Sequence, residues 1–145
     1  TRRMLTALVA LVGVFVAMYL ALYKAGVIGS LACGTGGCET VQLSKWSTLL
    51  GMPVANWGVL YYLGVFAVAF TMTTELGKDV RALPGMLLGL TTWGLIFSVW
   101  LTYLELFVIH AICRYCVVSA VLAIALFALA YLDWRAASRE ESTRV

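Results

Sequence analysis

The chain has 145 residues, of which 63% are hydrophobic and 12% are charged. Soluble domains are usually about half apolar and about a quarter charged, so this composition excludes an ordinary soluble protein and indicates lipid as the solvent. The formal net charge of +3 is small and gives no sign of a nucleic-acid partner. The length allows one domain, and we predict a single membrane domain over residues 1–145 with no thioredoxin-like domain.

Four apolar stretches are long enough to cross a bilayer as helices. A hydrocarbon core of about 30 Å needs roughly 20 helical residues, and these stretches do not alternate as membrane β-strands would. The first stretch lacks a clear signal-peptide cleavage site, so we expect it to remain as a helix. The sequence therefore predicts an all-α integral membrane protein, a bundle of four transmembrane helices at about 4–23, 54–74, 82–108 and 112–134.

The basic residues indicate how the four helices are oriented. Seven of the ten Lys and Arg residues fall on the face that receives both termini and the loop between the second and third helices. The other face carries Lys24, Lys45 and Arg114. Because cytoplasmic loops are enriched in Lys and Arg, both termini are predicted to be cytoplasmic and the 24–53 loop to face outward.

The outer loop over residues 24–53 is the longest segment outside the predicted helices. Its first half is rich in glycine and carries Cys33 and Cys38, which form either a redox pair or a disulfide that merely braces the loop. Its second half has apolar residues at helical spacing over 43–50, before Gly51 and Pro53. We predict a short amphipathic half-helix there, either lying on the bilayer surface or simply covering the bundle.

Cys113 and Cys116 form a C-x-x-C motif where the fourth helix begins. Residues three apart share a helix face, and the N–H groups of a helix N-terminus favour a thiolate. All four cysteines fall on the outer, oxidising side, which favours disulfide chemistry over a role as apolar filler. A zinc site completed by Cys33 and Cys38 is the alternative, but that oxidising side argues against it, and we expect no metal.

These features, in this order, resemble the vitamin K epoxide reductase family and its bacterial homologues. The resemblance covers essentially the whole chain. It rests on the first helix, a loop cysteine pair, a serine six residues later, a loop half-helix and a C-x-x-C at the outer end of the fourth helix, here Cys33, Cys38, Ser44, residues 43–50, Cys113 and Cys116.

The resemblance implies a role for each of these residues. Cys116 is expected beside a quinone, and Cys113 is expected to exchange with the loop through Cys38. Cys33 is expected to receive electrons from a protein partner. Ser44 is expected to hold the loop over a quinone bound among the helices.

Further candidates lie close to these residues. Asn56 and Tyr62, in the outer part of the second helix, are candidate quinone contacts, although a tyrosine near a helix end is often an interface anchor. Quinone reduction consumes two protons, which Glu105 or His110 could supply; alternatively, Glu105 simply reaches the interface. Animal members of the family carry a tyrosine where this chain has Ala120, and this departure favours the bacterial role over reduction of vitamin K epoxide.

The sequence thus predicts a membrane thiol:quinone oxidoreductase that supports disulfide bond formation in exported proteins. We expect its electron acceptor to be ubiquinone, menaquinone or a vitamin K-like quinone, and its donor to be a periplasmic or lumenal thioredoxin-like protein. A bacterial inner membrane is the expected location. The alternatives are a vitamin K epoxide or quinone reductase, and a membrane protein with purely structural disulfides. A transporter, or the other four-helix family of bacterial thiol oxidases, fits the cysteine order and polar residues less well.

Overall fold

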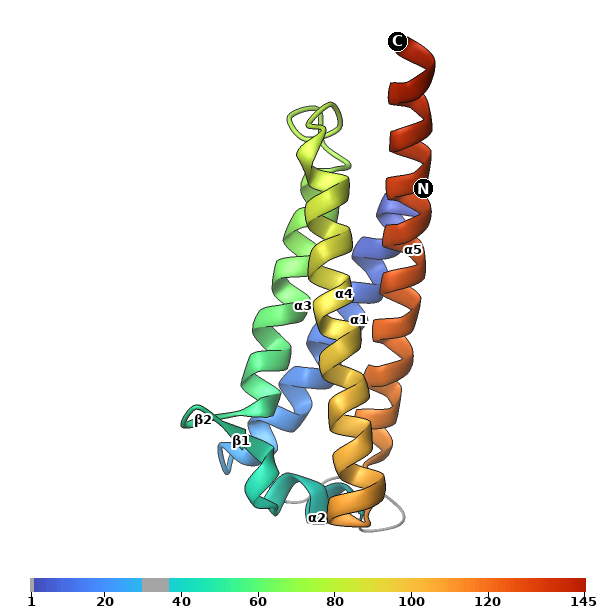
Figure 1. The fold of residues 1–145 in the computed structure, drawn as a ribbon. Helices are drawn as coiled ribbons and strands as arrows, with labels where there is room; N and C mark the ends of the chain where they lie inside the picture. The colour runs from blue at the N-terminus through green and yellow to red at the C-terminus, as the bar shows by residue number, and fades with distance from the viewer. Residues whose placement is uncertain (1, 30–36) are drawn as a thin grey trace.

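The computed structural model describes residues 2–29 and 37–145. The described residues contain four helices long and apolar enough to cross a membrane, and these helices form a bundle (Figure 1). They are α1 (Arg2–Lys24), α3 (Val54–Thr71), α4 (Ala82–Tyr103), which the π-helix η2 (Leu104–Ile109) continues, and α5 (Arg114–Arg144). The prediction of an all-α membrane protein built on a four-helix bundle is confirmed.

Small residues allow the helices to pack closely in the middle of the bundle. Helix α1 packs against α3 and α5, and α4 packs against α5. An ideal Cβ on Gly13 of α1 would lie 2.2 Å from a ring carbon of Tyr62 on α3, so only glycine leaves room for that ring. Large apolar side chains such as Phe15 (67% exposed) and Ile96 (58% exposed) point outward instead. Small residues between the helices and large apolar residues on the surface suit a protein surrounded by lipid, where small residues mediate helix contacts.

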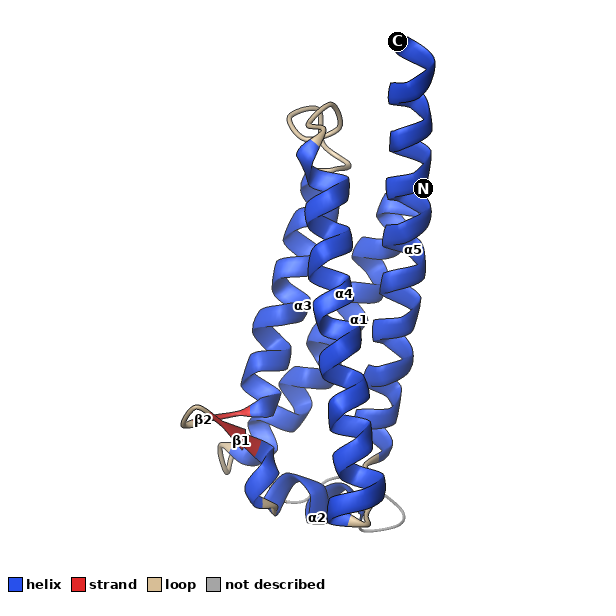
Figure 2. Cartoon of the chain, viewed as in Figure 1, coloured by secondary structure: helices blue, strands red, loops and turns tan. Residues whose placement is uncertain are grey.

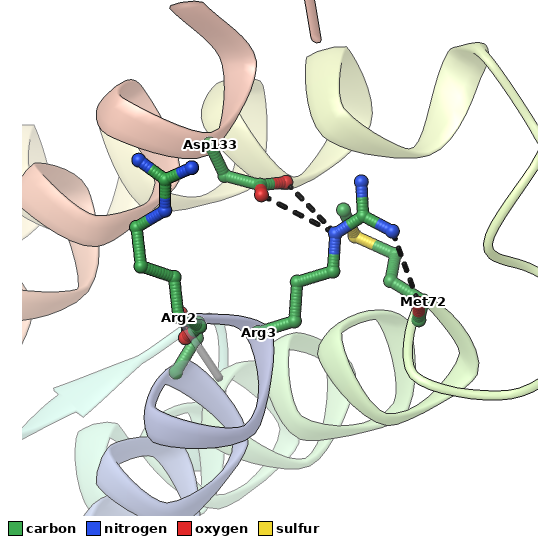
Figure 3. Close-up of polar contacts among 5 residues, drawn as sticks. Arg2, Arg3, Met72 and Asp133 are labelled. Atoms are coloured by element: carbon green, nitrogen blue, oxygen red, sulfur yellow. Dashed lines mark hydrogen bonds and ion pairs between the residues drawn. The ribbon is translucent and has the colours of Figure 1, made fainter. Parts of the chain in front are cut away.

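A partly buried ion pair joins the helices at the end of the bundle that holds the N-terminus (Figure 3). The Arg3 Nε donates to both carboxylate oxygens of Asp133, at 3.2 and 3.3 Å. The Arg3 Nη1 donates to the carbonyl of Met72 at 3.1 Å. One guanidinium therefore connects α1, α5 and the segment that follows α3. Charge-assisted hydrogen bonds of this kind are stronger than neutral ones.

All four predicted helices have different ends in the structure, although the first, predicted over 4–23, differs by at most two residues at either end. The helix predicted over 54–74 ends at Thr71, because the hydroxyls of Thr73 and Thr74 donate to carbonyls three residues back and compete with the helical pattern. The helix predicted over 82–108 continues to Ile109, but its last turn is a π-helix. The helix predicted over 112–134 begins at Arg114 and runs on to Arg144.

The short helix of the 24–53 loop lies earlier than the sequence predicted. The predicted half-helix over 43–50 is wrong in its position: helix α2 spans Gly37–Leu43, and only a single 3-10 turn, η1 (Lys45–Ser47), follows it. The Ser44 hydroxyl donates to the carbonyl of Val41 at 2.8 Å, a local bond that ends α2. The apolar spacing over 43–50 therefore does not reflect a helix.

A small hairpin occupies the rest of that predicted half-helix (Figure 2). Strand β1 (Thr48–Leu49) pairs antiparallel with β2 (Met52–Pro53). Leu50 and Gly51 both have positive φ, at 53° and 80°. Two successive residues of this conformation form the tight turn that matches the twist of a two-stranded ribbon. Gly51 therefore forms part of a hairpin turn and does not stop a helix.

Candidate active site

The C-x-x-C motif lies at the end of the bundle that α2 covers, called here the cysteine end. Cys113 is extended and comes directly before α5, and Cys116 lies in the first turn of that helix. Both are free thiols; Cys113 is fully buried and Cys116 is half-buried. A hydrogen bond with the Cys116 thiol, helped by the backbone N–H groups of Cys116 and Tyr115, lowers the pKa of Cys113 to about 7. The start of α5 therefore favours a thiolate at Cys113.

Helix α2 brings Cys38 to the same place. Figure 1 shows α2 lying across the end of the bundle, close to the connection between α4 and α5. Cys38 is fully buried, and it belongs to the same apolar cluster as Cys113. It is disulfide-bonded, whereas Cys33 lies outside the described residues. An ideal Cβ on Gly37 would lie 2.3 Å from the carbonyl oxygen of Ile112, so the two backbones touch just before the two cysteines.

Glu105 points into the cysteine end, where it is buried. It lies in the first turn of η2 and is only 6% exposed. Its Oε2 accepts the backbone N–H of Cys113 at 3.2 Å, and the carboxyl group also lies against Cys116. A π-helical turn is an uncommon feature that often accompanies a functional site. Of the two predicted proton donors, Glu105 is thus in contact with the cysteine pair.

His110 occupies a different position. It is exposed, it has a left-handed backbone conformation with φ 57°, and its N–H donates to the carbonyl of Glu105. The residue therefore ends η2 and redirects the chain toward Cys113. Its role as a proton donor stays a prediction.

Gln42 is a site residue that the sequence reasoning missed. It is 7% exposed, and its Nε2 donates to the Cys116 Sγ at 3.7 Å. Its own carbonyl accepts a hydrogen bond from the Nζ of Lys24 at 2.6 Å, and the same Nζ donates to Ser47 Oγ at 2.8 Å. Gln42 lies four residues after Cys38, so both face the same side of α2. That spacing was the available signal, but the helix was expected further along the chain.

An apolar cavity of about 480 Å³ extends from Cys116 between the helices. Its volume lies in the range of sites for small organic ligands. The polar residues of its wall include Glu105, Gln42, Thr102 and Ser119, whereas aromatic side chains cover much of the remainder. These are Trp57, Tyr61, Tyr62, Trp93 and Phe97. The cavity is thus an apolar compartment with one reactive sulfur in its wall.

The predicted quinone contacts fall in different places. Tyr62 lines the cavity. Its hydroxyl donates a hydrogen bond to the carbonyl of Ser119 at 3.0 Å and forms a hydrogen bond with the Oγ of Ser119 at 2.7 Å. Ala120 also lines the cavity. Ser44 and Asn56 are not among the lining residues. Among the described residues, no cluster of three His, Cys, Asp or Glu side chains is placed to hold a metal ion.

The comparison with known families agrees with this arrangement. The sequence matches the vitamin K epoxide reductase family over residues 4–131, which includes all four cysteines and all four long helices up to the last turns of α5. Members of this family are quinone-reducing oxidoreductases of membranes. With four apolar helices and a free C-x-x-C beside an apolar cavity, this chain is an integral membrane protein of the vitamin K epoxide reductase family.

Proposed function

We propose that the protein is a thiol:quinone oxidoreductase in which electrons pass from Cys33 and Cys38 to Cys113 and Cys116, and then to a quinone. The observation that carries the proposal is the division of the C-x-x-C between two environments. Cys113 is fully buried in one cluster with Cys38, whereas Cys116, which packs against that cluster, also lies in the wall of the apolar cavity. One cysteine can thus exchange with the loop while the other faces the electron acceptor.

The relay consists of thiol–disulfide exchanges followed by one two-electron reduction. The Cys38 thiolate attacks Cys113 Sγ of the Cys113–Cys116 disulfide, and Cys116 leaves with the electron pair as a thiolate. Attack of Cys33 on Cys38 then releases Cys113 as a thiolate and closes the loop disulfide. The resulting dithiol gives two electrons to the quinone, which takes up two protons to become a quinol, and the Cys113–Cys116 disulfide forms again.

The redox states in the structure fit one stage of this cycle. Cys38 is disulfide-bonded while Cys113 and Cys116 are free thiols. This combination corresponds to the stage after the loop has passed its electrons on and before the quinone is reduced. A chain whose disulfides only braced its loops would have no need of a reduced pair beside a cavity.

Glu105 is the side chain that we assign to proton transfer during quinone reduction. It is buried, it touches the N–H of Cys113, and it lines the same cavity as Cys116. A carboxyl group at this depth is costly unless it has a function or a partner. Tyr62 lines the same cavity, and this position supports it as a quinone contact. Ser44 acts at a distance from the quinone, because its hydroxyl ends α2.

The orientation in the membrane, the donor protein and the quinone complete the proposal. The distribution of Lys and Arg supports cytoplasmic termini, so the cysteine end faces the periplasm or a lumen. A thioredoxin-like protein there would deliver electrons taken from exported proteins as they gain disulfides. The absence of a tyrosine at Ala120 supports a bacterial inner-membrane enzyme that uses ubiquinone, menaquinone or a related quinone, rather than a vitamin K epoxide reductase.

Quinone reduction by the purified protein in detergent tests the proposal. Dithiothreitol is the donor, and each of ubiquinone, menaquinone and vitamin K quinone is the acceptor. The wild type should turn over, Cys116→Ala should not, and Val121→Ala, a lipid-facing change on the same helix, should resemble the wild type. A wild type that reduces none of the three quinones would refute the proposal.

A further inference from the structure

Helix α2 presents two residues, one turn apart, to the two cysteines of the C-x-x-C. Cys38 lies in the buried cluster with Cys113, and the amide of Gln42 donates to Cys116 Sγ at 3.7 Å. Each cysteine of the pair therefore meets its own residue of α2. The proposed exchange uses Cys38, but it gives no role to Gln42.

The position of Gln42 is fixed by bonds that do not involve the cysteines. Lys24, the last residue of α1, donates to the Gln42 carbonyl at 2.6 Å and to Ser47 Oγ at 2.8 Å. Gln42 itself is 7% exposed, so its amide has little water to bond with in place of the sulfur. A buried polar group held in this way has a definite partner, and here that partner is the reactive sulfur.

We propose that Gln42 stabilises the thiolate at Cys116 through its amide N–H, and that α2 supplies this donor only while it is docked on the bundle. The inference rests on the proposed function, because it concerns the thiolate that forms there. When Cys38 attacks Cys113, Cys116 leaves as a thiolate and Cys113 is tied up in the mixed disulfide. At this stage the Gln42 amide is a donor to the Cys116 thiolate, so one helix both starts the exchange and stabilises its product.

Other titratable groups also face Cys116 and are held constant in the test. Among the described residues these are Glu105 from η2, Cys113 from the start of α5 and Tyr62 from α3. From α1, Tyr19 packs at a tilt against Tyr115 next to the pair, with ring centroids 5.1 Å apart. A Gln42 variant changes none of these groups directly, so a change in thiol titration reports on the amide.

The experiment is the pH profile of thiol alkylation in the full-length protein with the loop disulfide intact. In a Cys113→Ala background, the rate reports on Cys116. Gln42→Leu should raise the midpoint of the Cys116 alkylation profile by about one pH unit, because a charge-assisted hydrogen bond to the thiolate is lost. At a fixed pH below both midpoints, this shift corresponds to about tenfold less thiolate. Gln42→Glu should raise the midpoint further by placing a carboxylate beside the sulfur. Lys24→Met should give a smaller rise, because Gln42 is then less firmly held.

Two controls separate this role from a general loosening of α2. Leu43→Ala alters the next residue of α2, which is exposed, and should leave the Cys116 midpoint unchanged. In a Cys116→Ala background, Gln42→Leu should leave the Cys113 midpoint unchanged. The proposal is overturned if Gln42→Leu and Gln42→Glu both titrate as the wild type does, or if Leu43→Ala shifts the midpoint equally. The titration needs no quinone, so failure of quinone turnover with these shifts present would reject only the proposed function.

Discussion

The contact between α2 and the segment before Cys113 makes Gly37→Ala the most informative single substitution. An ideal Cβ at Gly37 would lie 2.3 Å from the carbonyl oxygen of Ile112, about 1 Å closer than an ordinary van der Waals contact. Both sides of this contact are backbone, so neither can move aside by a side-chain rotation. The added methyl group must therefore push α2 away from the bundle, and Cys38 with it.

The size of the effect follows from the usual cost of overpacking. Forcing an extra methyl group into a filled space costs about 1–3 kcal/mol. At 25 °C this cost lowers the docked fraction of α2 by about fivefold to more than a hundredfold. If exchange needs the docked helix, the rate of disulfide formation between Cys38 and Cys113 should fall by the same factor. The helix preference of alanine works in the opposite direction but is smaller, roughly 0.5–1 kcal/mol.

The assay isolates this one exchange. A chain with Cys33→Ser and Cys116→Ser keeps only Cys38 and Cys113, and oxidation with glutathione disulfide, followed by quenching and mass spectrometry, gives the rate at which they join. Gly29→Ala is the matched control, because it lies in the same loop and its Cβ would meet nothing within 4 Å. If Gly37→Ala joins the two cysteines as fast as Gly29→Ala does, then α2 does not need to dock for the exchange.

Three further predictions concern other parts of the molecule. Alkylation of Cys113 should be half-maximal near pH 7 and slower below it, and Cys116→Ala should move that midpoint upward, because the Cys116 thiol is a donor to the Cys113 thiolate; an unchanged midpoint would contradict this. Glu105→Gln should lower quinone turnover by roughly a hundredfold or more, as expected for loss of a proton donor, while the exchange between the two cysteine pairs continues. Arg3→Met should lower the free energy of unfolding by about 1–3 kcal/mol, measured by thermal melting in detergent, because Asp133 keeps its burial and loses its cation. Adding Asp133→Leu to Arg3→Met should recover most of the lost free energy of unfolding. Equal melting temperatures of the single and double variants would show that the unpaired Asp133 is not the cause of the loss.

The bundle and the position of the C-x-x-C could be predicted from sequence because both depend on local properties. A run of about 20 apolar residues specifies a spanning helix whatever its neighbours are. The C-x-x-C follows directly from its place at the start of such a helix. The secondary structure of the 24–53 loop was harder to predict, since the spacing of the apolar residues over 43–50 fits a helix as well as it fits the observed turn and hairpin. The positive φ of Leu50 and Gly51 was not apparent from the pattern alone.

The sequence by itself thus determined that this is a four-helix membrane protein with paired cysteines at one end. Only the tertiary structure decided which polar side chains meet the reactive sulfur. Glu105 turns inward through a π-helical turn, and Gln42 reaches Cys116 because Lys24 holds its backbone. These contacts join residues far apart in the chain, and a buried polar side chain is stable only opposite a suitable partner. No pattern along one helix reveals what lies across from it.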